Sequence, residues 1–141
     1  MIENGIDGSG ALRALESLGW DAQWAAAFAP HAAPGAWPVR VVAQHRESWV
    51  VSDGRADDVA RAAGRLRHAA LEEGGELPAV GDWVVVEGAP GAGGERRIVG
   101  ILPRRGTFVR KEAGARTRAQ VVAANVDLAL VVTALPNDLQ L

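Results

Sequence analysis

The residues of this sequence that could take part in chemistry are mostly cations, and they are unevenly distributed. Residues 96–118 include eight basic residues and one acidic residue, Glu112, although the 141-residue chain has a net charge of −2. Eight positive charges minus one leave a local charge of +7, and such a segment attracts polyanions by counterion release whatever the total charge. This pattern indicates either a nucleic-acid-binding surface or an arginine-rich edge exposed to solvent.

Six of these cations are close enough in sequence to converge on one rim of a fold. Because Glu112 is the only acid nearby and an arginine can bind phosphate oxygens with two hydrogen bonds, we expect RNA contact rather than internal ion pairs. The six are Arg104, Arg105, Arg110, Lys111, Arg116 and Arg118. Further candidates are Arg65, Arg67, His45 and Arg46, together with Trp49 as the aromatic best placed to stack on a base.

The same inventory excludes several classes of enzyme. The chain has no cysteine, and its three histidines lack the spacing of a metal site. The only lysine, Lys111, is followed by Glu112, so a phosphate-binding loop of the form GxxxxGK with Ser or Thr next is absent, as is the guanine-reading motif NKxD. We therefore expect no catalytic residue, cofactor or metal in this chain.

Targeting signals are also missing from the sequence. No apolar run is long enough to span a membrane, and the N-terminus has neither a basic nor an apolar leader segment. We expect a cytoplasmic protein that does not bind membranes.

Apolar spacing predicts short helices near the N-terminus and strands after them. Leucine and aromatic residues recur at helical intervals over 12–28, with an interruption at Gly19. From Ala36, five β-branched runs separated by Gly and Pro turns are typical of a small five-stranded barrel, with Trp83 as its surest core residue. The runs are PVRVVAQ, SWVVS, DWVVVE, RRIVGILP and TFVRKE.

Two other segments lie outside these five runs. The alanine-rich DDVARAAGRLRHAALEE favours a helix by composition, but its alternation also fits a strand. The final run, QVVAANVDLALVVTA, predicts a strand that is buried on both faces and lies outside the barrel. Because an exposed strand recruits partners, we expect 127–133 either to pack against the barrel or to pair with another chain, giving a dimer.

The order of four motifs resembles a known family. The motifs that carry the resemblance are, in order, GRLRHAA, LPAVGDWVVVE, RRIVGILPRRGTFVRKEAG and QVVAANVDLALVVTALPNDLQL. The chain resembles the N-terminal part of the ribosome small-subunit-dependent GTPase A family, whose members are circularly permuted GTPases. The resemblance covers 12–141 and implies an OB-fold barrel, then a GTPase domain with GTP and magnesium, and a C-terminal zinc domain. It also implies that 59–70 form a barrel strand bent at Gly64, and that the loop with His45 and Arg46 contacts the ribosome.

These arguments together predict an all-β fold. We expect a leader with a short helical extension at 1–35, a five-stranded OB-fold barrel at 36–118, and the first strand of a truncated α/β GTPase domain at 119–141. The expected function is RNA binding that docks a ribosome-assembly GTPase on 16S rRNA of the small ribosomal subunit. Two alternatives stay open, namely a domain that braces or regulates its own GTPase domain, and an independent single-stranded nucleic-acid binder.

Overall fold

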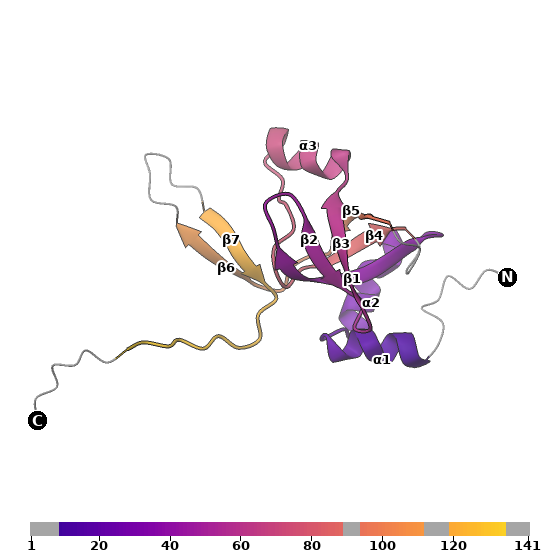
Figure 1. Cartoon of the computed structure of the whole chain (residues 1–141), viewed down its shortest axis with the longest axis horizontal. Helices are drawn as coiled ribbons and strands as arrows, with labels where there is room; N and C mark the ends of the chain where they lie inside the picture. The colour runs from indigo at the N-terminus through magenta and orange to yellow at the C-terminus, as the bar shows by residue number, and fades with distance from the viewer. Residues whose placement is uncertain (1–8, 89–93, 112–118, 135–141) are drawn as a thin grey trace, which may run out of the picture.

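A closed barrel of five strands forms the centre of the molecule. The computed structural model describes residues 9–88, 94–111 and 119–134. Figure 1 shows the barrel between one helix on one side and the N-terminal helices on the opposite side. The barrel strands are β1 (Ala36–Gln44), β2 (Trp49–Ser52), β3 (Asp57–Ala62), β4 (Trp83–Glu87) and β5 (Arg96–Ile101). Their order is β1-β2-β3-β5-β4, with β3 and β5 parallel and the other neighbours antiparallel. This confirms the expected OB-fold barrel.

Strand β4 shows why the sequence reads WVVV without polar alternation. Val84 and Val86 point into the barrel core, where they join β-branched residues of the other strands such as Val39 and Ile98. Trp83 and Val85 point outward into a second apolar cluster formed with the N-terminal helices. A strand covered on both faces needs apolar residues at every position. Trp83 is buried, as predicted, but it packs on the outer face of the barrel and not in its interior.

The N-terminal helices cover the outer face of β4. They are α1 (Ser9–Ser17), α2 (Ala22–Phe28) and the short 3-10 helix η1 (Ala29–His31). The expected interruption is Gly19, whose positive φ of 94° reverses the chain between α1 and α2. Trp20 then packs edge to face on Trp83, with ring centroids 4.8 Å apart. The helical extension is therefore part of the folded unit through its aromatic residues.

The segment GRLRHAALE forms a helix, α3 (Gly64–Glu72), and the prediction of a strand over 59–70 is wrong beyond Ala62. The helix follows the Ala-rich composition that the family resemblance had overruled. The Ala63 N–H donates to the Ile98 carbonyl at 2.8 Å, and Leu66 packs against the barrel core. Helix α3 therefore lies across one end of the barrel.

The run TFVRKE is a strand, β6 (Thr107–Lys111), but it does not join the barrel as expected. Among the described strands it pairs with β7 (Ala119–Ala124) alone, and β3 takes the place in the barrel that the five sequence runs had given to TFVRKE. This two-stranded sheet, here called the arm, projects from the barrel (Figure 1). Every residue of β6 is exposed, so none of its side chains belongs to the barrel core.

The apolar run ends as a strand at Ala124. Residues 126–134 have no regular structure and are exposed, with Val131 at 93%. The strand expected over 127–133 is therefore wrong, and so is its packing against the barrel. Pairing with a second chain stays a prediction. Within the described residues, no helix has the length and apolarity to cross a membrane.

Candidate nucleic-acid interface

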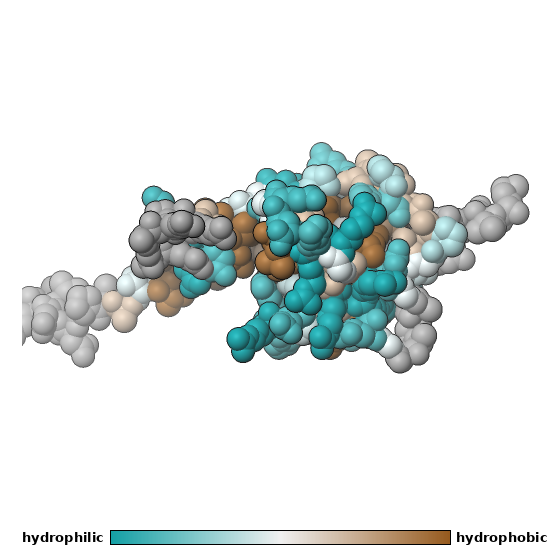
Figure 2. Space-filling model, turned by 90° about the horizontal axis from the view of Figure 1, so that it is seen from above, coloured by the Kyte–Doolittle hydropathy of each residue, from teal (hydrophilic) through white to brown (hydrophobic). Residues whose placement is uncertain are grey.

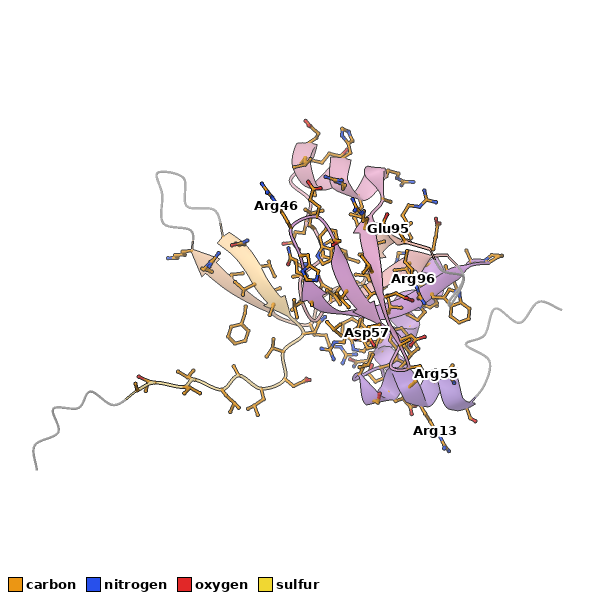
Figure 3. The ribbon with its side chains drawn as sticks, viewed as in Figure 1. Arg13, Arg46, Arg55, Asp57, Glu95 and Arg96 are labelled. Carbon is orange, nitrogen blue, oxygen red and sulfur yellow. The ribbon has the colours of Figure 1, made fainter. Side chains whose placement is uncertain are left out.

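Helix α3 and the loop between β1 and β2 lie at the same end of the barrel. Trp49, the first residue of β2, pairs with Ala60, and β3 ends two residues later, just before α3. Figure 3 shows Arg46 at the tip of this hairpin, pointing away from the barrel on the side of α3. The space-filling view from this end shows mostly hydrophilic side chains over the barrel, whereas hydrophobic ones gather toward the arm (Figure 2).

Five basic residues on this end form what we call the cationic end. All five are exposed, and none of them has an ion pair within the described residues. They are His45, Arg46, Arg65, Arg67 and His68. The acids on the same two elements are Glu47 and Glu72. Long cationic side chains that are not committed to carboxylates can be shared with phosphate oxygens.

A groove runs from the cationic end along the side of the barrel, between α3 and β5. Its volume is about 690 Å³, and Arg65 and Arg97 lie on its lining together with His31. Glu87 also lines it, and its carboxylate lies 3.4 Å from the Arg97 guanidinium. The groove therefore extends the surface available to a polyanion, with one carboxylate partly balancing its charge.

The arm carries the second group of exposed cations. Arg110 and Lys111 lie at the end of β6 that is farther from the barrel, and Phe108 on the same strand is 51% exposed. Arg110 donates from Nη2 to the Gln120 side chain at 2.7 Å, which is a neutral partner. Strands β6 and β7 contain no acidic residue. The arm is therefore cationic, with an aromatic ring in solvent.

Arg104 is directed into the protein. Its side chain is only 9% exposed, and it donates from Nε and Nη2 to the two carboxylate oxygens of Asp82 at 2.8 and 2.7 Å. It also pairs with Glu76. The hydrogen bond that Arg104 donates to Asp82 raises the pKa of Arg104 against the opposing effect of burial. Asp82 itself is 0% exposed and accepts a further bond from the Ala79 N–H.

Arg105 joins the barrel to the N-terminal helices. Its two terminal nitrogens donate to the two carboxylate oxygens of Asp21 at 2.7 and 2.6 Å, and its guanidinium lies 4.2 Å from the Trp24 ring centroid. The Asp21 carboxylate also caps α2 by accepting from the Trp24 N–H. The bond from Arg105 is the main reason why the pKa of Asp21 falls to about 2.

The expected convergence of six cations on one rim is therefore wrong for the residues that the structure describes. Arg104 and Arg105 precede β6 and are held at the barrel, whereas Arg110 and Lys111 lie at the opposite end of that strand. Arg116 and Arg118 lie outside the described residues. The acids that pair with the first two come from Asp21, Glu76 and Asp82, which are distant in sequence, so counting local acids could not reveal them.

Trp49 is not a stacking platform. Its ring is 4% exposed within the barrel core, and Nε1 donates to the Pro78 carbonyl at 2.8 Å. The sequence correctly placed Trp49 beside the hairpin loop, but its side chain lies on the inner face of β2 and not on the outer face that stacking needs. Phe108, on β6, is instead an aromatic residue that the structure exposes.

No three His, Asp or Glu side chains among the described residues are grouped so that they could hold a metal ion.

Comparisons with known proteins find relatives over most of this chain. No family model matches the chain. It is 40% identical over 134 residues to a protein named small ribosomal subunit biogenesis GTPase RsgA from Opitutus terrae, covering 90% of this chain and 36% of that protein. Proteins of the same name from Xanthomonas oryzae pv. oryzae and Xanthomonas axonopodis pv. citri are each 39% identical, over 88% of this chain and 34% of theirs. The chain thus spans about a third of the length of these relatives.

Proposed function

We propose that this chain is an RNA-binding OB domain that docks a ribosome-biogenesis GTPase on 16S rRNA of the small ribosomal subunit. The proposal is supported by its similarity, over 90% of its length, to a protein named small ribosomal subunit biogenesis GTPase RsgA. The observation that carries the proposal is the cationic end, where exposed arginines that have no ion pair with any described residue lie on two adjacent elements of an OB barrel. Folded RNA is recognised largely by shape and phosphate contacts, which such a surface provides. The arm supplies further contacts through Arg110 and Lys111. Its place of action is the cytoplasm.

The enzymatic step belongs to the rest of the protein in this proposal. The relatives are named GTPases, and this chain lacks the phosphate-binding and guanine-reading motifs that GTP hydrolysis needs. GTP, magnesium and a zinc ion would then be bound by residues outside 1–141. Isothermal titration of this chain with GTP and magnesium should give no binding, and micromolar affinity would contradict the assignment.

The test of RNA binding is the salt dependence of binding to purified small ribosomal subunits. Changing Arg65→Gln and Arg67→Gln together should remove about two phosphate contacts and reduce the slope of log affinity against log salt by about two units. The matched control changes Arg13→Gln and Arg55→Gln, which are exposed cations beside α1, at the other end of the barrel (Figure 3). Equal slopes for the two double variants would refute the assignment of the interface.

A second candidate function is supported by the ion pairs of Arg104 and Arg105. Both residues connect the barrel to other segments, as expected for a domain that braces its neighbours. If small subunits bind equally well to the wild type and both double variants, with equal slopes, bracing becomes the better account of this domain.

A further inference from the structure

Three segments that are distant in sequence meet at the base of the arm. They are the turn after α1, the loop before β4, and the end of β7. The guanidinium of Arg40, from β1, donates to a main-chain carbonyl of each. Nε donates to Gly81 at 3.2 Å, Nη2 donates to Asn125 at 3.1 Å, and Nη1 donates to Leu18. One side chain therefore connects the N-terminal helices, the barrel and the arm.

Asn125 is fixed from all sides at this point. Its Oδ1 accepts from the Arg105 N–H at 2.8 Å, and its Nδ2 donates to the Gly81 carbonyl at 3.1 Å. Its own N–H donates to Gly106 at 2.9 Å, and its carbonyl accepts from Arg40. Its φ of 54° is left-handed, a conformation that asparagine tolerates better than other residues with a side chain. All four polar groups of Asn125 are thus hydrogen-bonded, to β1, to the loop before β4 and to the turn before β6.

The arm also touches the barrel loop through its backbone. The Ala124 N–H donates to the Val80 carbonyl at 2.8 Å, next to a parallel bridge between Val80 and Ala123. Gly81 has a φ of 94°, and a Cβ there would lie 2.0 Å from the Ala124 carbonyl oxygen. Only glycine permits this approach. The base of the arm is therefore closely packed against the loop before β4.

We propose that Arg40 and Asn125 form a clamp that holds the arm at a fixed angle to the barrel, with the N-terminal helices as its third part. A two-stranded sheet is marginally stable alone, so its direction depends on the contacts at its base. Arg40 is then a positioning residue. Its effect on RNA binding rests on the proposed function, because a rigid arm loses less conformational freedom when both surfaces bind one RNA. The clamp itself does not depend on that function.

Amide hydrogen exchange of the 141-residue chain tests the clamp. In Arg40→Gln and Arg40→Lys, the amides of Ala124 and Asn125 should exchange at least tenfold faster than in the wild type, because neither replacement can reach three carbonyls. The barrel amides of Ala63 and Leu102 should change much less. The control Arg61→Gln removes an exposed arginine that pairs with Glu95 and should leave the arm base unchanged. An equal acceleration at all four amides, or none at the arm base, would overturn the clamp.

A second variant keeps the test decisive if Arg40 proves necessary for folding. Asn125→Gly retains access to the left-handed backbone and removes two side-chain hydrogen bonds, so exchange at Arg105 and Ala124 should still accelerate. Unchanged exchange there would overturn the clamp.

Binding to small subunits separates the clamp from the proposed function. Arg40→Gln should weaken affinity several-fold with an unchanged salt slope, because a positioning residue makes no phosphate contact that its loss could remove. A slope reduced by about one unit would make Arg40 an RNA contact and overturn its positioning role. If the wild-type chain does not bind small subunits, the proposed function fails, and the exchange experiment still decides the clamp.

Discussion

The arginines of the cationic end and those that precede β6 differ in surroundings although their side chains are identical. Arg65 and Arg67 are exposed and have no ion pair within the described residues. Arg104 and Arg105 each bind a carboxylate with two nitrogens. The first pair can exchange water for phosphate at little cost to the fold, whereas the second pair is part of the fold. A run of cations in a sequence therefore does not by itself identify a binding surface.

Breaking the buried ion pair should have the largest effect on stability. Arg104→Gln leaves the fully buried Asp82 carboxylate without its cation, so we expect a loss of about 3–5 kcal/mol in the free energy of unfolding. Urea denaturation followed by tryptophan fluorescence measures this loss. Adding Asp82→Asn to Arg104→Gln should recover part of the stability, because it removes the unpaired charge. A loss below about 1 kcal/mol for the single variant would show that the pair is solvated.

The exposed ion pair between Asp21 and Arg105 should have a smaller effect that depends on pH. The pKa of Asp21 is about 2 when folded and near its ordinary value of 3.8 when unfolded, so its contribution is present above pH 3.8 and is lost as the pH falls toward 2. Asp21→Asn keeps a helix-capping oxygen and removes the charge. The urea midpoints of the wild type and Asp21→Asn should therefore differ at pH 6 and converge near pH 2. A difference that persists at pH 2 would contradict an electrostatic origin.

The cationic end should contribute least to stability. Arg65→Gln and Arg67→Gln should each change the free energy of unfolding by no more than about 0.5 kcal/mol, because both side chains are exposed and have no ion pair among the described residues. The same urea measurement checks this. A loss comparable with that of Arg104→Gln would place these residues among the structural arginines and remove the distinction between the two regions.

The sequence alone determined the features that depend on neighbours along the chain. Strand runs bounded by Gly and Pro predicted β1, β2, β4 and β5, and the break at Gly19 predicted two short helices. The run DWVVVE predicted β4, with Trp83 as a core residue. Local composition also favoured a helix over 64–72, and the error there came from preferring the resemblance to that local signal.

Tertiary structure alone decided which side chains are free. Trp49 turned inward because the register of β2 against β1 and β3 directs its ring to the core. Strand β6 lies outside the barrel because it pairs with β7, and the spacing of apolar residues within TFVRK does not predict this partner. Arg104 and Arg105 acquired partners 22 and 84 residues away. Such contacts depend on the closure of the chain in three dimensions, whereas propensity and spacing act only over a few residues.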